Sequence, residues 1–264
     1  PIDFYKQKIL QIYEENEVEE TVAANTLGTI VHNTLEEFYK PLEGQKLTKE
    51  LIVLMQQKIN KEVANQFKKE FKKGDISKGQ NLIIYNIAKR YVSNFLKQEI
   101  KLVSRSNSVI IKHIESDLRT QLNIPSLNYP VYITGKVDRI DEVDGVIRII
   151  DYKTGKVEQG KVELVHWEDI TTDYTKFSKP FQILTYAYMI MQQQKFNKPV
   201  EAGIISFKNL NAGFLKFSKK DKEGRGAKKE SIITEDILSN FMNELKCLIE
   251  DICNLNIPFT EKEV

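Results

Sequence analysis

The stretch GKVDRIDEVDGVIRIIDYKTG, residues 135–155, decides the expected fold. It mixes Val, Ile, Tyr and Thr, which favour strands, with an unusual number of charged residues. Asp144-Gly145 in its middle is a strong signal for a two-residue hairpin turn, from which the two strands pair outward residue by residue. In that register Asp138 lies directly opposite Asp151, with Cβ atoms roughly 4.5–5.5 Å apart.

Side chains alternate between the two faces of such a hairpin. The expected first face carries Lys136, Asp138, Ile140, Ile149, Asp151 and Lys153, and the second carries Val137, Ile150 and Tyr152. Two opposed carboxylates repel each other, and a hard divalent cation such as Mg²⁺ would relieve that repulsion. Lys153 on the same face could orient a water or neutralise charge that develops on a phosphate. The alternative is a register shifted by one residue, with both acids solvated.

The patterns around the hairpin predict an α/β chain in which helices come first. Helices are expected at 4–20, 27–42, 48–73 and 79–103, strands at 108–118, 200–210 and 213–218, and a further helix at 180–194. We expect Asn25 or Thr26 to cap the second helix, Pro41 to stop it, and Thr234 to cap a last helix. Residues 156–179 read as a polar connection.

Bulk composition limits the classes of protein to consider. The chain has 264 residues, of which 41% are hydrophobic and 29% are charged, which is ordinary globular composition. No apolar run reaches membrane-spanning length and no signal peptide is visible, so we expect a cytoplasmic protein that does not contact a membrane. Cys247 and Cys253 fall in a helical apolar pattern and are expected to be buried, reduced thiols.

Charge and chain start add two expectations. The formal net charge is only +2, so affinity for nucleic acid would have to come from local patches. Residues 219–230 are basic and are expected to form a mobile loop, which could contact DNA phosphates. The first residue is Pro1, not methionine, which favours a piece of a longer chain.

Five motifs follow one another along the chain: GTIVHNTLEEF (28–38), KHIESDL (112–118), GKVDRID (135–141), IIDYKTG (149–155) and QILTY (182–186). The set resembles the core of the PD-(D/E)XK nuclease superfamily, and is similar to its RecB-type branch, which includes the nuclease domains of AddB and RecB. The resemblance spans about residues 26–190. It implies an α/β, restriction-endonuclease-like fold with a mixed central sheet flanked by helices. Residues 1–264 would form one nuclease domain, with 42–104 as a helical insertion.

The resemblance also implies roles for particular residues. The metal would be bound by His32, Asp138, Asp151 and the backbone carbonyl of Tyr152. The catalytic residues would be Asp138, Asp151 and the lysine Lys153. Gln182 and Tyr186, four residues apart on one helix face, would contact the DNA backbone and support the lysine. Glu115 is a further candidate for the site.

Two departures from this branch matter. Many of its members hold an iron–sulfur cluster with four cysteines, one of them before the histidine motif. No cysteine precedes His32, and Cys247 and Cys253 do not share a helix face, so no cluster is expected. The helicase-like part that AddB and RecB carry upstream is also missing here, so the chain is either a stand-alone nuclease or a domain of a longer one.

The expected function is a Mg²⁺- or Mn²⁺-dependent deoxyribonuclease with little sequence specificity. An exonuclease in DNA recombination or repair fits the resemblance, with DNA and a helicase subunit or helicase-like domain as partners. The alternative is a nuclease fold that has lost cutting and serves as a DNA-binding module. Hydrolysis of another phosphodiester is a third reading, which nothing in the sequence favours.

Overall fold

The computed structural model describes residues 10–11, 24–70 and 76–258. Its centre is a mixed five-stranded sheet in the order β1-β2-β3-β5-β6. The pairing of β3 with β5 is parallel, and the other neighbouring strands are antiparallel. The strands are β1 (Val109–Leu122), β2 (Val131–Val143), β3 (Val146–Lys153), β5 (Val200–Ser206) and β6 (Phe214–Lys216). A small second sheet joins β4 (Glu163–Leu164), β7 (Ser218–Lys220) and β8 (Lys229–Glu230).

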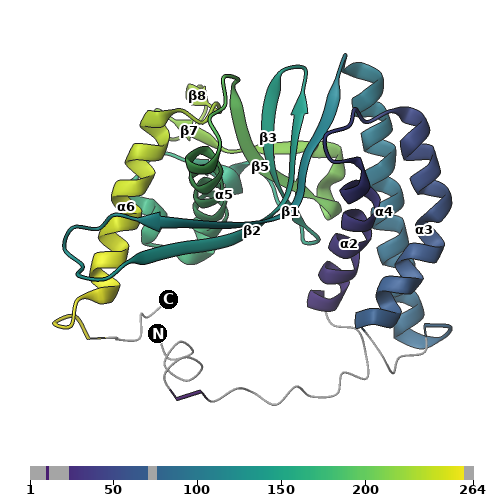
Figure 1. The fold of residues 1–264 in the computed structure, drawn as a ribbon, viewed down its shortest axis with the longest axis horizontal. Helices are drawn as coiled ribbons and strands as arrows, with labels where there is room; N and C mark the ends of the chain where they lie inside the picture. The colour runs from purple at the N-terminus through teal and green to yellow at the C-terminus, as the bar shows by residue number, and fades with distance from the viewer. Residues whose placement is uncertain (1–9, 12–23, 71–75, 259–264) are drawn as a thin grey trace.

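Helices cover both faces of the central sheet (Figure 1). On one face lie α2 (Ala24–Tyr39), α3 (Lys49–Glu70) and α4 (Gly79–Arg105), and on the other α5 (Tyr174–Gln193) and α6 (Glu235–Cys253). Short 3-10 helices are η2 (Lys40–Leu42), η3 (Gln159–Val162), η4 (Glu168–Thr171) and η5 (Phe207–Ala212). The expected fold class, a mixed central sheet flanked by helices, is confirmed.

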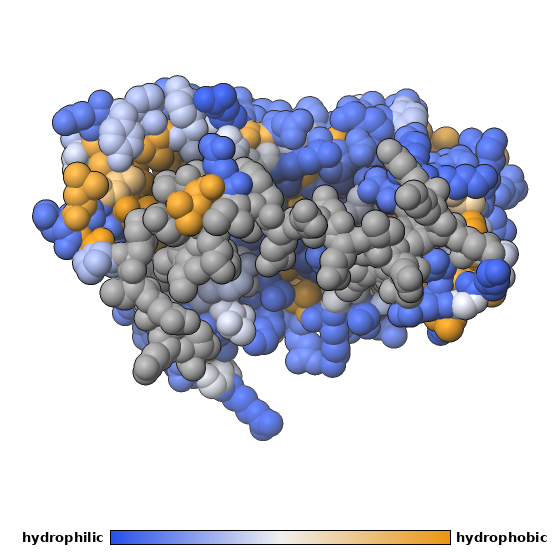
Figure 2. Space-filling model, turned by 90° about the horizontal axis from the view of Figure 1, so that it is seen from below, coloured by the Kyte–Doolittle hydropathy of each residue, from blue (hydrophilic) through white to orange (hydrophobic). Residues whose placement is uncertain are grey.

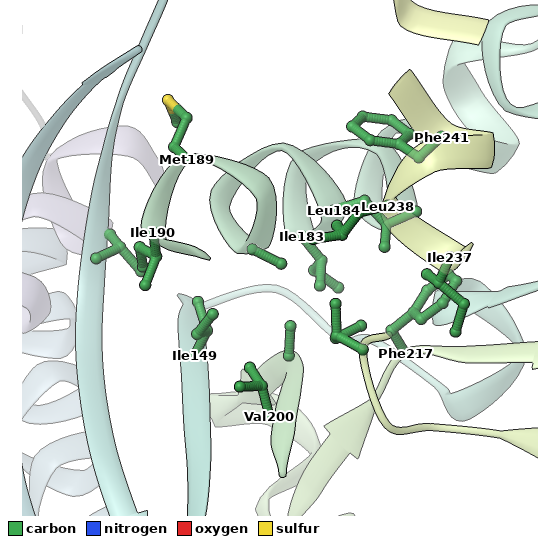
Figure 3. Close-up of a cluster of buried hydrophobic side chains, with 14 of the residues drawn as sticks. Ile149, Ile183, Leu184, Met189, Ile190, Val200, Phe217, Ile237, Leu238 and Phe241 are labelled. Atoms are coloured by element: carbon green, nitrogen blue, oxygen red, sulfur yellow. The ribbon is translucent and has the colours of Figure 1, made fainter. Parts of the chain in front are cut away.

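Two hydrophobic clusters hold these layers together, one on each face of the sheet. In the first, side chains of α5 and α6 meet Ile149 of β3 and Val200 of β5 (Figure 3). In the second, α2, α3 and α4 pack against Ile150 and Tyr152. Because neighbouring residues of β3 point into different clusters, this strand is buried on both sides, as expected of a strand with a parallel neighbour.

The hairpin forms as the sequence predicts. Asp144 and Gly145 have φ angles of 49° and 88°, which a type I′ turn requires. The pairing runs from Val143↔Val146 to Arg139↔Ile150, in the predicted register. The alternative register, shifted by one residue, is therefore wrong.

Helix α5 begins earlier than expected. Its first residue is Tyr174, because the Asp173 side chain accepts a hydrogen bond from the backbone N–H of Lys176 and caps the helix. Pro180, expected at the helix entrance, lies inside α5. The expected polar connection 156–179 accordingly contains the start of α5, as well as η3, β4 and η4.

Other boundaries also differ. Helix α2 begins at Ala24, so the expected caps Asn25 and Thr26 lie inside it. The expected strand 200–210 stops at Ser206, where η5 begins. The ends of 219–230 pair as β7 and β8, so this segment is a hairpin and not an open loop, and its mobility stays a prediction. The expected helix 4–20 lies almost wholly outside the described residues.

Several other expectations are met. Helix α2 ends at Tyr39, and Pro41 lies in η2, which follows directly. Thr234 caps α6 by accepting from the backbone N–H of Ile237. That residues 1–264 form one domain with 42–104 as an insertion stays a prediction; in the structure α3 and α4 occupy most of that range.

Burial of Cys247 was expected and is wrong. The buried residues of α6 follow one helical stripe that includes Ile237, Phe241 and Leu245. Cys247 lies two residues beyond that stripe, which turns it to the opposite side of the helix, and it is exposed. Cys253 is partly buried, and both thiols are free.

The surface shown in Figure 2 is mostly hydrophilic where described residues are visible, with apolar side chains gathered in small separate patches. None of the helices in the described part of the chain is long and apolar enough to cross a membrane.

Candidate active site

The two strands of the hairpin separate just past Arg139↔Ile150, where their ladder of paired residues ends. The Asp138 carboxylate then accepts a hydrogen bond from the backbone N–H of Tyr152 at 2.5 Å. Asp138 and Asp151 are nevertheless both buried, at 9% and 5% exposure. The two acids are therefore neighbours, as predicted, but they lie where the strands of the hairpin separate and not opposite each other in the ladder.

A histidine and two acids from three elements meet at this open end. His32 of α2 places Nδ1 3.2 Å from Oδ1 of Asp138 on β2. Glu115 of β1 joins them, so that one ligand atom from each of the three residues lies within 4.8 Å of the others. The edge of the His32 ring meets the ring of Tyr152, with centroids 5.9 Å apart, which helps to orient the imidazole.

Glu115 adopts an unusual backbone conformation. Its φ is 51°, in the left-handed region that residues with a Cβ seldom occupy. Its neighbours Ile114 and Ser116 pair with Arg139 and Val137, which sets Glu115 beside Asp138. Strain of this kind, when it occurs, is common at functional sites.

Lys153 is held from two sides at the end of β3. Its Nζ lies 3.1 Å from Oδ1 of Asp151 and 3.0 Å from Oε1 of Gln182 on α5. Gln182 in turn donates to the hydroxyl of Tyr186 at 2.8 Å. Gln182 and Tyr186 thus lie on one helix face, as their spacing predicts, and Gln182 contacts the lysine.

A glycine makes room for this chain of hydrogen bonds. A Cβ on Gly135 of β2 would lie 2.8 Å from Cε1 of Tyr186 and 3.0 Å from Cε of Met189. The glycine of the GKVDRID motif therefore lets α5 approach β2 closely enough to bring Tyr186 and Gln182 to Lys153.

The chain beyond Lys153 is also fixed. Lys153 is paired with Ser206 of the neighbouring parallel strand. The Ser206 hydroxyl donates to the carbonyl of Gly155 at 2.8 Å and accepts from the N–H of Val157 at 3.1 Å. Ser206 thus fixes the backbone at Lys153 and the backbone that follows it.

The alternation of faces fails at one point. Ile140 and Ile149 share a cluster and Ile150 points into the other, as predicted. Val137, however, belongs to the same cluster as Ile140. The physical reason is that the regular ladder is interrupted at Asp138. There the Tyr152 N–H donates to the Asp138 side chain and not to a backbone carbonyl of β2.

Lys136 does not join Lys153. Its Nζ pairs with Glu115 at 2.8 Å, whereas Lys153 pairs with Asp151. The expectation that both lysines lie together on one face is therefore wrong. The same break in alternation explains it.

The excess of acids shifts the titration of the site. Burial, together with the charge of Asp138, raises the pKa of Asp151 to about 6, although Lys153 opposes this. Burial also raises the pKa of Glu115, against the effect of Lys136. For His32, burial lowers the pKa, but the carboxylates of Asp138, Glu115 and Asp151 outweigh it, so that the pKa is raised.

These residues suit a divalent cation. His32, Glu115 and Asp138 offer one nitrogen and two oxygen ligands in a small space, and a cation would relieve the repulsion between the nearby carboxylates. Asp151 lies outside the group of mutually close ligand atoms found among the described residues, since Lys153 engages it. Glu115, a further candidate from the sequence, belongs to that group together with His32 and Asp138.

A second group of buried charges was missed by sequence reasoning. We call Glu99, Arg139, Asp141 and Arg148 the arginine network. Arg139 is wholly buried and donates to Glu99 on α4 at 2.8 Å, and Arg148 donates twice to Asp141, both at 2.7 Å. Arg139 also lies 2.6 Å from Asp141. Three of the nine charged residues in 135–155, Arg139, Asp141 and Arg148, thus compensate one another together with Glu99.

With this geometry established, comparison with known proteins identifies the class. The model of the PD-(D/E)XK nuclease superfamily matches residues 1–263. The chain therefore belongs to the PD-(D/E)XK nuclease superfamily, whose members use divalent metal ions.

Individual relatives add little detail. An uncharacterized protein of Rickettsia bellii is 22% identical over 169 residues, and one of Rickettsia typhi is 25% identical over 171 residues. Each match covers 61% of this chain but 18% of the relative's length. A crystal structure described as a "Putative exonuclease" from Eubacterium rectale has 13% identity and a TM-score of 0.40, covering 96% of this chain and 84% of that one.

Proposed function

We propose that the chain is a Mg²⁺- or Mn²⁺-dependent deoxyribonuclease that hydrolyses DNA phosphodiester bonds with little sequence specificity. One observation carries the proposal: His32, Glu115 and Asp138 converge on one point, beside a lysine that Asp151 and Gln182 hold in place. In a member of this superfamily, that arrangement supports a cutting site at the open end of the hairpin.

The metal-binding residues would be His32, Asp138 and Asp151, with the Tyr152 carbonyl as a backbone ligand and Glu115 as a further one. A bound divalent ion would polarise the scissile phosphate and lower the pKa of a water. Proteins bind Mg²⁺ mainly through carboxylates and substrate phosphate, which suits these acids. The histidine ligand is also compatible with Mn²⁺.

The remaining residues position and neutralise. Asp151 and Gln182 hold the amino group of Lys153 in place. Lys153 would orient the attacking water and balance negative charge that develops on the phosphate. Gln182 and Tyr186 would hold the DNA backbone from α5. Because the hydrogen bond between them is already formed, the substrate meets a preorganised pair.

The sequence motifs also suggest a biological setting. The RecB/AddB-type motifs favour an exonuclease of recombination or repair, working in the cytoplasm on DNA beside a helicase subunit or helicase-like domain. The two relatives are far longer than the matched segment, which agrees with a nuclease unit inside a larger protein. No iron–sulfur cluster is expected, because the free cysteines Cys247 and Cys253 lie on one helix but on different sides.

The competing function is a DNA-binding module without cutting. The hydrogen bonds from Lys153 to Asp151 and Gln182 argue against it, because binding alone does not require a lysine held next to buried acids. We therefore favour the active nuclease.

A cleavage assay tests the proposal. Purified protein is incubated with linear and with circular DNA in Mg²⁺, in Mn²⁺ or in EDTA, beside the Asp151→Ala and Lys153→Ala variants. Asp117→Ala, at an exposed position of β1, is the matched control. We expect degradation that needs the metal, is about 10²–10³-fold slower in both site variants, and is unchanged in the control.

The substrates separate the remaining alternatives. Loss of linear DNA alone would indicate an exonuclease, and loss of both forms an endonuclease. Binding of DNA without degradation in either metal would reject the nuclease in favour of the binding module.

A further inference from the structure

A groove of 540 Å³ opens beside Lys153, between the edge of β2 and helix α5. Gly135 and Lys153 line it from the sheet. From α5 it is lined by Tyr174, Ser178 and Gln182, which follow one another at four-residue steps and so form one helical stripe. The groove therefore runs from the candidate active site along α5 to its first turn.

Tyr174 stands at the far end of this groove with its ring in solvent. It is 86% exposed, the most exposed tyrosine or phenylalanine among the large hydrophobic residues of the described chain. Phe181, also in the groove, already packs edge-on against Phe241 at 5.5 Å. A tyrosine that buries so little area contributes little to the fold, and its ring is accessible to a ligand that enters the groove.

The charges of the groove are those of a site for a phosphate chain. Lys153 and Lys179 both line it. The helix end itself is not the anion site, because the Asp173 carboxylate caps it. Cationic groups along a groove, together with an exposed aromatic ring, are the combination that binds single-stranded nucleic acid.

The length of the groove suits a short segment of one strand. At about 1.5 Å rise per residue, Tyr174 lies about 12 Å from Gln182 along α5. A duplex keeps its bases stacked inside, where a tyrosine at the groove wall does not reach them, whereas an unpaired base offers a free face. The ring thus matches a base a short way along the strand from the phosphate at Lys153.

We propose that Tyr174 is a stacking site for an unpaired base of the strand being cut, so that the substrate is single-stranded between this ring and Lys153. This inference rests on the proposed nuclease function and adds a substrate requirement to it.

A binding cycle tests the contact itself. Affinities of metal-free protein in EDTA, where no cutting occurs, are measured by fluorescence anisotropy for an oligothymidylate and for a strand of the same length made of abasic sites. The two ligands have the same phosphates and differ only in the bases. The proteins are the wild type, Tyr174→Ala, Tyr174→Phe, and the control Tyr129→Ala, which removes another exposed tyrosine at the β1–β2 connection.

We expect Tyr174→Ala to weaken binding of oligothymidylate by about 5- to 100-fold and to leave binding of the abasic strand unchanged. Tyr174→Phe keeps the stacking face and should bind within about twofold of the wild type, as should Tyr129→Ala. Circular dichroism confirms that all four proteins are folded.

Other results would overturn the inference. Equal loss on both strands would mean that Tyr174 acts through structure or charge, and no loss on either would mean that it makes no contact. If the wild type cuts DNA while Tyr174→Ala binds both strands normally, this inference fails and the nuclease proposal stands. If the wild type neither binds nor cuts DNA, both fail.

Discussion

The hairpin β2–β3 carries two groups of buried charges within a few residues of each other, and they are built on opposite principles. The arginine network has two acids and two arginines, which contact one another directly. The candidate site has three acids, Glu115, Asp138 and Asp151, against two lysines, Lys136 and Lys153, so that its balance depends on whether His32 is protonated. One group is balanced by itself, and the other is not.

The pKa shifts record this difference. Burial would raise the pKa of Asp141, but the charges of Arg148 and Arg139 outweigh burial and lower it. For Asp151, burial and the charge of Asp138 prevail over Lys153, and the pKa rises to about 6. Asp141 is thus a buried acid whose charge its neighbours compensate, and Asp151 is one whose burial Lys153 compensates only in part.

The largest expected effect is on stability, from Asp141→Ala. It leaves Arg139 and Arg148 facing each other without their shared acid, which should cost about 3–5 kcal/mol of unfolding free energy. Urea denaturation measures the loss. Asp117→Ala, at an exposed position, should change stability by less than about 0.5 kcal/mol. A small loss for Asp141→Ala would remove the structural half of the comparison.

The second-largest expected effect is on the rate of cleavage, and it comes from Asp138→Asn, which lies on β2 like Asp141. The amide oxygen can still accept from Tyr152 N–H, so the fold should persist, but the lost charge should slow cleavage by about 10²–10³-fold. Steady-state cleavage of linear DNA measures the rate, and thermal unfolding checks the fold. Full activity in this variant would contradict the assignment of the unbalanced group to chemistry.

The third effect concerns pH. The folded pKa of Asp151 is above its unfolded value of 3.8, so the metal-free protein loses stability from this group as pH rises from about 4 through 6. Asp151→Asn should therefore be more stable than the wild type at pH 8, by up to about 3 kcal/mol, and nearly equal at pH 4. Urea unfolding of both proteins in EDTA, at pH 4 and at pH 8, measures this difference. If Asp151→Asn were less stable than the wild type at pH 8, the charged Asp151 would not be short of positive charge around it.

The smallest effect tests the wall of the site. Gly135→Ala forces the ring of Tyr186 and the end of Met189 to move, which should cost about 1–3 kcal/mol and reduce cleavage. Gly160→Ala is the control, because an added Cβ there meets no atom within 4 Å. Equal stability of the two variants would mean that the close approach of α5 is not required.

Local chemistry made the hairpin predictable. Asp144-Gly145 fixes both the turn and the register, and from these follow the neighbourhood of Asp138 and Asp151 and the direction of Lys153. The four-residue spacing of Gln182 and Tyr186 likewise predicted that the two would act together. These features depend on residues close in sequence, where the geometry of strand and helix determines which side chains meet.

What could not be predicted depends on contacts between distant segments. The partner of Arg139 is Glu99 on α4, and nothing near either residue indicates it. The positive φ of Glu115 and the resulting pairing with Lys136 follow from how β1 lies against β2. The start of α5 was predictable, because Asp173 is an ordinary N-cap; Pro180, which favours the first turn of a helix, lies inside α5 instead.

The separate origins of the ligands bear on how the protein reaches its active form. Asp138, Asp151 and Lys153 belong to one local hairpin, which can form early, whereas His32 arrives only when α2 docks from far upstream in the chain. We expect partly folded chains to lack a complete metal site and to be harmless to DNA. A refolding experiment in which cleavage appeared before α2 was protected from hydrogen exchange would refute this. If the proposed cleavage of DNA holds, the chain would then need some other safeguard during synthesis.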